Sequence, residues 1–186
     1  MLELYPAIDL RAGRCVRLHQ GDFAAETIYD DDPVAVARAF AAAGAPWIHV
    51  VDLDAARTGE PANLAVIERI AEAVDCPLQV GGGVRDETAA DALLLAGATR
   101  VVVGTAAVED PALVDRLCMS HPGRVAVGLD ARGREVAVRG WVTGSGADLL
   151  DLAHRFETSG VAALIVTEIG RDGTMEGPDL AQLRAV

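Results

Sequence analysis

The chain has few aromatic residues and no long apolar run. Aromatic residues make up 4% of the 186 residues, although 51% are hydrophobic and 24% are charged. This balance excludes a disordered or collagen-like chain and predicts one soluble domain with a sizeable core. No apolar stretch reaches the length of about 18 residues that a membrane span requires, and no basic segment precedes an apolar one at the N-terminus. We therefore expect neither export nor a membrane span.

Cysteine is also scarce. Cys15, Cys76 and Cys118 are odd in number, lie far apart and form no C-x-x-C pair. This pattern excludes a disulfide framework and a zinc site, and it predicts reduced thiols in the cytoplasm. The four histidines show no metal-ligand spacing, so no metal is expected. His49 falls inside a predicted strand and is interpreted as a packed core residue.

Basic residues are outnumbered by acidic ones. Sixteen Lys and Arg face 28 Asp and Glu, which gives a formal net charge of −12. Such a charge disfavours a nucleic acid or an anionic membrane as a partner. A small anionic ligand is still compatible with it, because a few backbone amides can hold a phosphate whatever the global charge.

Short Val- and Ile-rich runs alternate with Ala-rich segments whose apolar residues have helical spacing. This alternation predicts repeated βα units around a parallel sheet, and therefore an α/β fold. The predicted strands are 4–8, 47–51, 78–80, 100–103, 125–129 and 164–167. The predicted helices are 34–43, 63–74, 87–96, 111–118 and 148–158, with the start of a sixth at 179–186.

Two pairs of segments resemble each other. Residues 9–14 resemble 130–134 at an offset of 121, and 47–52 resemble 163–168 at an offset of 116. The first and second βα units therefore recur as the fifth and sixth. This repeat predicts a (β/α)8 TIM barrel in which a half of four βα units occurs twice.

The repeat also predicts domain boundaries. We expect a single barrel domain over 1–186, with a first half-barrel over about 1–121 and the start of a second over about 122–186. Eight units at this offset need about 232 to 242 residues, so we expect a barrel truncated after about six units. An open sheet exposes edge strands, so we expect a monomer if the barrel is complete and self-association if it is truncated.

Three aspartates are candidate catalytic residues, because ligands of parallel βα folds lie at the carboxyl ends of the strands. Asp9 is predicted to end strand one and Asp130 strand five, on opposite sides of the barrel mouth. Asp172 follows strand six. Opposed carboxylates suit an isomerisation in which one group removes a proton and another delivers one. The alternative is that each Asp caps a loop or helix.

Two glycine loops are candidate phosphate sites. Residues 81–83, with Gly82 and Gly83, precede Arg85, and Gly104 precedes Thr105. Glycine lets the backbone approach an anion, and consecutive N–H groups can bind it. The alternative is a pair of tight turns. The repeat predicts a second phosphate site after strands seven and eight, and hence a ligand with a phosphate at each end.

Further candidates for substrate contact are Arg17, Arg139, Trp141 and Thr167. Arg139 and Trp141 lie in a predicted long loop, where they suit stacking on a ring or clamping an anion. A loop anchored by a buried Trp is an equal alternative. Arg17 either meets a ligand or pairs with an acid.

These features together resemble the ProFAR isomerase family of histidine biosynthesis, the phosphoribosylformimino-aminoimidazole carboxamide ribotide isomerases. The resemblance runs the length of the chain. The matching segments are 5–10, 13–18, 20–22, 51–55, 79–85, 103–106, 140–141, 171–174 and 177–178.

The resemblance implies a two-fold repeated TIM barrel and an Amadori rearrangement of a bisphosphorylated substrate, without a metal or organic cofactor. It implies that Asp9 is the general base and Asp130 the general acid, with Asp172 as a rival for the acid. It further implies substrate contacts from the residues already described: Gly82, Gly83, Arg85, Gly104, Thr105, Arg139, Trp141 and Thr167.

Three related interpretations stay open. Bifunctional relatives also isomerise phosphoribosylanthranilate, and residues 139–141 are compatible with that activity. The cyclase subunit of imidazole glycerol phosphate synthase shares the fold but usually has Cys where this chain has Ile8. A catalytically incomplete barrel that acts only as an association module is the third interpretation.

Overall fold

The computed structural model describes residues 3–186, and these form two compact units. Unit 1 holds the described residues up to Arg17 together with Thr27–Val102. Unit 2 holds Leu18–Glu26 and Val103–Val186. The half-barrel boundary near residue 121 is a different division, based on the repeat, and it stays a prediction.

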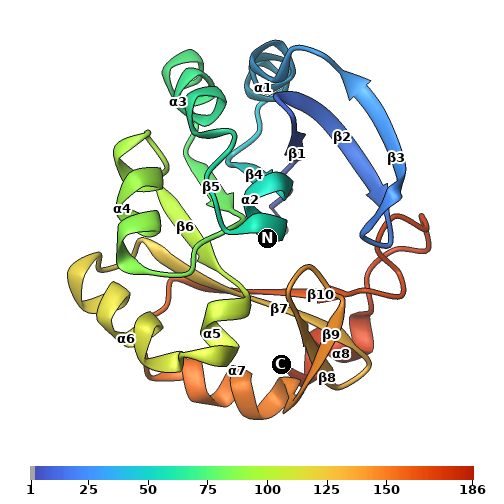
Figure 1. Cartoon of the computed structure of the whole chain (residues 1–186), viewed down its shortest axis with the longest axis vertical. Helices are drawn as coiled ribbons and strands as arrows, with labels where there is room; N and C mark the ends of the chain where they lie inside the picture. The colour runs from blue at the N-terminus through green and yellow to red at the C-terminus, as the bar shows by residue number, and fades with distance from the viewer. Residues whose placement is uncertain (1–2) are drawn as a thin grey trace. The chain divides into compact units, whose positions relative to one another are not determined.

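Unit 1 is built on four parallel strands with one antiparallel neighbour (Figure 1). The strands follow the order β2, β1, β4, β5, β6, and helices alternate with them along the chain. The strands are β1 (Ala7–Arg11), β2 (Arg14–His19), β4 (Ile48–Asp52), β5 (Leu78–Gly81) and β6 (Arg100–Val103), and the helices are α1 (Pro33–Ala42), α2 (Leu53–Thr58), α3 (Leu64–Ala73) and α4 (Glu87–Leu95). β3 (Asp22–Asp30), like β2 and β6, contains residues of both units.

Unit 2 combines a parallel pair with a meander. β7 pairs in parallel with β10 and antiparallel with β8, which pairs with β9. In Figure 1 the part of this unit that follows β6 is drawn from yellow-green to red. The strands are β7 (Val125–Arg132), β8 (Glu135–Val138), β9 (Thr143–Asp148) and β10 (Ala163–Glu168), and the helices are α5 (Thr105–Glu109), α6 (Pro111–Ser120), α7 (Leu149–Glu157) and α8 (Leu180–Ala185).

The predicted α/β class is confirmed, and the parallel strands are consistent with a TIM barrel. All four positions of β5 and of β6 are buried, as expected where both faces of a parallel strand are covered. The helix boundaries follow local capping chemistry. Asp32 accepts hydrogen bonds from two amides of the first turn of α1, Pro33 occupies its first position, and Gly44 follows its end with φ +85°.

Three sequence predictions need correction. The first strand covers Ala7–Arg11 rather than 4–8, and Leu4, predicted to belong to it, is 73% exposed. Asp9 therefore lies inside the strand rather than at its end. Asp130 likewise lies inside β7. The segment predicted as a long loop around residue 140 is the β8–β9 hairpin. Its second strand has the sequence TGSGAD, which lacks any apolar alternation, so its pairing depends on the partner strand.

Strands β4, β5 and β6 place a polar row in the interior of unit 1. Their register aligns His49 with Gln79 and Gln79 with Arg100. The Gln79 amide bonds to His49 Nδ1 at 3.0 Å and accepts from Arg100 Nε at 2.8 Å. The Arg100 guanidinium lies 4.5 Å from the centre of the Trp47 ring, which stacks on Tyr5. His49 is therefore a packed residue with its ring nitrogen engaged.

We expect the free energy of unfolding to fall between pH 6.5 and pH 4 because of His49. Burial lowers the pKa of His49 from 6.5 to about 4. The unfolded chain binds a proton in this window that the folded chain does not bind, so stability present above pH 6.5 is lost as pH falls. The shift corresponds to about 3 kcal/mol. Urea titrations at pH 7 and pH 4 check this, with His49→Gln as the comparison. The prediction fails if both proteins lose equal stability.

Candidate active site

Asp9 lies beside Arg17 in the β1–β2 hairpin of unit 1. Asp9 is the register partner of Val16, and Arg17 Nη1 lies 3.2 Å from Asp9 Oδ2. The Asp9 side chain is 12% exposed and that of Arg17 is 39% exposed. A neighbouring guanidinium stabilises the ionised form of a carboxylate. The hairpin thus brings two of the predicted site residues together as an ion pair.

The glycine loop after β5 is shaped by close contacts. Gly82 and Gly83 have φ values of +101° and +74°. A Cβ at Gly82 would lie 2.2 Å from the carbonyl oxygen of Asp52, and one at Gly83 would lie 2.7 Å from Cβ of Ala55. Only glycine fits such a backbone so near the start of α2. This packing accounts for both glycines, and the predicted phosphate contact here stays a prediction.

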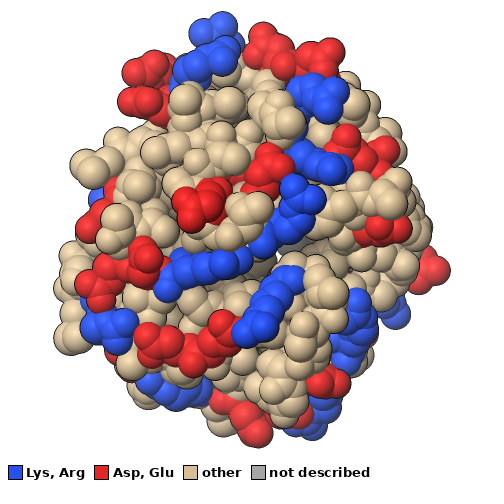
Figure 2. Space-filling model, viewed as in Figure 1, with Lys and Arg blue, Asp and Glu red and all other residues tan. Residues whose placement is uncertain are grey.

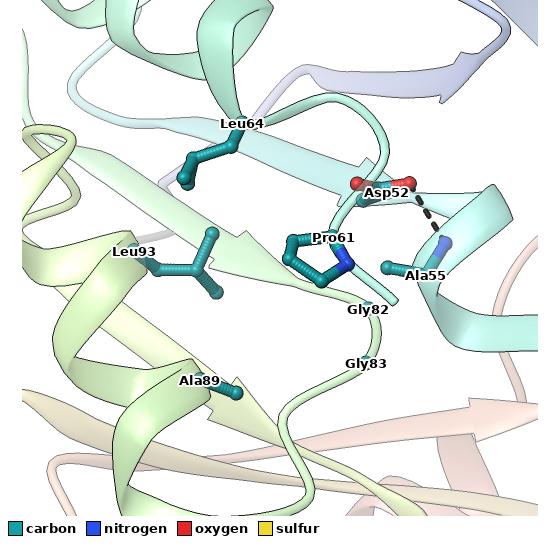
Figure 3. Close-up of a pocket in the computed structure, with 8 residues that line it drawn as sticks. All are labelled: Asp52, Ala55, Pro61, Leu64, Gly82, Gly83, Ala89 and Leu93. Atoms are coloured by element: carbon teal, nitrogen blue, oxygen red, sulfur yellow. Dashed lines mark hydrogen bonds between the residues drawn. The ribbon is translucent and has the colours of Figure 1, made fainter. Parts of the chain in front are cut away.

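A small cavity lies beside this loop, within unit 1 (Figure 3). Its volume is about 20 Å³, which is the space of roughly one water molecule. Figure 3 shows Leu64 of α3 and Leu93 of α4 pointing into it, with Gly82 and Gly83 along one edge. The cavity is therefore a packing space behind the loop, too small for a sugar phosphate.

Arg85 is exposed and lies against the end of α2. Its guanidinium donates to the carbonyl oxygens of Thr58 and Ala56, both at 3.4 Å. A cation is stabilised at a helix C-terminus, where the last carbonyl groups are not bonded within the helix. Because a guanidinium carries five N–H donors, these two contacts leave donors that can bind an anion.

Asp130 lies in a different environment, in β7 of unit 2. Trp141 Nε1 donates to Asp130 Oδ2 at 2.8 Å, and Thr167 is its register partner in β10. Burial raises the pKa of Asp130, and the negative charge of Asp172 raises it further. Hydrogen bonds from Trp141 and Thr167 oppose these effects. Unit 2 therefore brings Trp141, Thr167 and Asp172 together around the Asp130 carboxyl group, which retains its proton at a higher pH than usual.

The turn of the β8–β9 hairpin holds Trp141 in place. Arg139, Gly140 and Trp141 have φ values of +57°, +67° and +70°. Positive φ is costly for residues with a side chain and is found where surrounding contacts enforce it. Here the Arg139 amide donates to Thr105 Oγ1 at 2.8 Å, and Arg139 Nε donates to Glu109 at 3.0 Å. Trp141 is half-buried, and its predicted contact with a substrate stays a prediction.

The charged surface is mixed in sign. All 16 basic residues are arginines, because the sequence has no lysine. Figure 2 shows both acidic and basic side chains on this face. Within residues 3–186 no group of three or more His, Cys, Asp or Glu side chains is arranged to hold a metal ion. None of the helices in this described range is long and apolar enough to cross a membrane.

Comparison with known proteins gives one consistent result. Residues 3–186 match the family described as "Histidine biosynthesis protein". The chain is 52% identical over 183 residues to 1-(5-phosphoribosyl)-5-((5-phosphoribosylamino)methylideneamino) imidazole-4-carboxamide isomerase of Paracoccus denitrificans, covering 98% of this chain and 77% of that protein. The chain belongs to the ProFAR isomerase family. The isomerase of the same name from Rhodospirillum rubrum is 53% identical over 177 residues, covering 95% of this chain and 73% of that protein.

In this member of the ProFAR isomerase family, the sequence did not reveal the role of two residues, Gln20 and Gly21. Gly21 packs against Trp141, and Gln20 bonds to the loop that contains Gly170 and Asp172. A Cβ at Gly21 would lie 2.5 Å from Trp141 Cε3, so the indole packs directly on the β2–β3 turn. Gln20 Nε2 donates to the Gly170 carbonyl oxygen at 2.9 Å. The available signal was the segment 20–22, which is part of the family pattern but carries no information about what it contacts.

Replacing Trp141 by phenylalanine tests the tie to Asp130. The variant keeps an aromatic ring but removes the N–H that stabilises the Asp130 carboxylate, so we expect the pKa of Asp130 to rise further. If Asp130 is the general acid, the basic limb of the kcat/KM profile moves to higher pH. Steady-state rates across the pH range check this. An unchanged profile means that the indole does not influence the titrating group.

Proposed function

We propose that this chain catalyses the ProFAR isomerase reaction, in which an aminoaldose becomes an aminoketose by proton transfer between carboxyl groups and substrate. The observation that carries the proposal is the contrast between two strand-borne aspartates. Asp9 is paired with a guanidinium, whereas Asp130 is half-buried and its pKa is raised by the loss of solvent around it. Pairs of acids whose environments separate their proton affinities are the arrangement that acid and base catalysis requires.

In the proposed mechanism Asp130 acts first, as the general acid. It protonates the ring oxygen of the aminoaldose ribose, the C1–O bond breaks, and the nitrogen lone pair forms a Schiff base. Its raised pKa suits this step, because an acid must carry its proton near the working pH. Trp141 and Thr167 then stabilise the carboxylate that remains.

Asp9 is assigned the second proton transfer. As a carboxylate beside Arg17, it removes the proton from ribose C2. The C2–H electron pair forms the C1–C2 double bond of an enolamine while the C1=N π pair of the Schiff base returns to nitrogen. Protonation at C1 and loss of the hydroxyl proton at C2 give the ketose. The Arg17 guanidinium, 3.2 Å from Asp9 Oδ2, holds the carboxylate in place by a charge-assisted hydrogen bond.

Phosphate contacts complete the proposal. In unit 1 we assign them to Gly82, Gly83 and the remaining N–H donors of Arg85. In unit 2 we assign them to Gly104 and Thr105, whose hydroxyl accepts from Arg139 and can still donate to a phosphate oxygen. The reaction serves amino-acid biosynthesis, so we place the chain in the cytoplasm.

Turnover of purified substrate tests the proposal. The 186-residue chain is incubated with ProFAR and, separately, with phosphoribosylanthranilate, and products are followed by absorbance and mass. We expect conversion of ProFAR to its ribulosyl isomer without added metal or cofactor. Turnover of both substrates would identify the bifunctional type. A folded chain that converts neither substrate would refute the proposed function.

A further inference from the structure

Asn63 occupies a helix-cap position but does not use its side chain to cap. It immediately precedes α3, where an Asn side chain normally accepts a hydrogen bond from the first turn and so stabilises the helix. Here no such bond forms. The side chain is instead buried, with the residue 2% exposed. An Asn that forgoes capping and is buried in this way must be held by other partners.

Those partners lie in the β1–β2 turn and in the β4–α2 junction. Asn63 Oδ1 accepts from the Gly13 amide at 2.9 Å. Its Nδ2 donates to Asp52 Oδ1 at 2.7 Å and to Asp54 Oδ2 at 3.1 Å. Asp54 Oδ2 also accepts from the Ala12 amide at 2.7 Å. Both amides of the two-residue turn are therefore held by side chains from another part of unit 1.

This turn controls the hairpin that carries Asp9. Ala12 and Gly13 have φ values of +48° and +78°, the left-handed pair typical of a tight two-residue turn. The left-handed region is unfavourable for an alanine because its Cβ crowds the backbone, so the turn needs support. Its geometry fixes the register that sets Asp9 opposite Val16 and beside Arg17.

We propose that Asn63, acting with Asp54, is a positioning residue for Asp9: it fixes the β1–β2 turn and thereby the carboxylate that removes the C2 proton. An amide is required at position 63 because it accepts from Gly13 while donating to two carboxylates. An Asp at this position would add a third carboxylate to Asp52 and Asp54. The inference rests on the proposed function of Asp9.

The test uses four variants of the full chain. Asn63→Ala and Asp54→Ala each break part of the clamp, which is the set of hydrogen bonds that Asn63 and Asp54 make with the Ala12 and Gly13 amides and with each other. Asp54→Asn keeps an oxygen that can accept from Ala12 and should restore the wild-type behaviour. The matched control is Asp32→Ala, which removes the side-chain cap of α1. Helices α1 and α3 both have ten residues and both lie in unit 1. Amide hydrogen exchange at Ala12 and Gly13, the amide resonances of Asp9 and Arg17, and ProFAR kinetics are measured for each.

We expect exchange at Ala12 and Gly13 to become at least about tenfold faster in the two clamp-breaking variants. We expect kcat to fall about 10- to 100-fold with KM within about twofold, because a small misplacement of a reacting group costs rate rather than affinity. Asp32→Ala and Asp54→Asn should resemble the wild type in both measurements. Unchanged exchange in Asn63→Ala, or an equal loss of kcat in Asp32→Ala, would overturn the inference.

The measurements also separate this inference from the proposed function. If the wild-type chain does not turn over ProFAR, the proposed function fails, and the resonances of Asp9 and Arg17 then decide whether the clamp positions them. Shifts of both resonances in Asn63→Ala but not in Asp32→Ala support the positioning role. Resonances that stay in place in Asn63→Ala refute it.

Discussion

Replacement of Asp9 by asparagine lowers kcat for ProFAR by about 10²- to 10⁴-fold, the usual contribution of a general base. Asparagine keeps the size and an oxygen that Arg17 can approach, so the hairpin is expected to persist. What is lost is the ability to accept a proton from ribose C2. Steady-state kinetics with ProFAR measure the effect, and circular dichroism checks that the variant is folded.

The matched control for this variant is Asp31→Asn, which removes one negative charge from an exposed position of the same unit. It should leave kcat and KM within about twofold of the wild type, since exposed charges in water interact weakly. If Asp9→Asn retains more than about a tenth of the wild-type kcat, Asp9 is not the general base.

Replacement of Asp130 by asparagine has a comparable expected effect, because it removes the group proposed as the general acid. We expect kcat to fall by about 10²- to 10⁴-fold. In the wild type, activity should decline as pH rises through the raised pKa of Asp130, where the acid loses its proton. Rates measured across the pH range give this limb directly.

Asp172 provides the comparison that separates the two candidate acids. Its negative charge raises the pKa of Asp130, so Asp172→Asn should move the basic limb of the profile to lower pH while a measurable rate remains. The opposite pattern, in which Asp172→Asn abolishes turnover and Asp130→Asn retains it, would assign the acid to Asp172.

The sequence predicts most of the regular fold because the signals involved are local. The helix 33–42 is marked by Asp32, Pro33 and Gly44, and the structure places its ends within one residue of the prediction. The buried strands β5 and β6 are marked by consecutive apolar residues. The β8–β9 hairpin was missed since its second strand is polar and glycine-rich, and only pairing with β8 makes it a strand.

The candidate site was predictable in part. The repeat singled out Asp9 and Asp130 because both occupy the same place in a βα unit. Their environments could not be predicted, since the bond from Trp141 to Asp130 depends on how a hairpin folds back. Asn63 shows the same limit. In the sequence it has the features of an ordinary helix cap, whereas its side chain bonds to a turn 50 residues earlier in the chain.

The most direct test of the central claim, that carboxylates of this chain move the C2 proton, is a single-turnover experiment with ProFAR deuterated at ribose C2. Excess enzyme removes product release from the measured rate. The account predicts that the wild type converts the deuterated substrate more slowly than the undeuterated one. It also predicts that Asp9→Asn converts substrate at no more than a few per cent of the wild-type rate. Equal rates for the two isotopes, or undiminished conversion by Asp9→Asn, would contradict it.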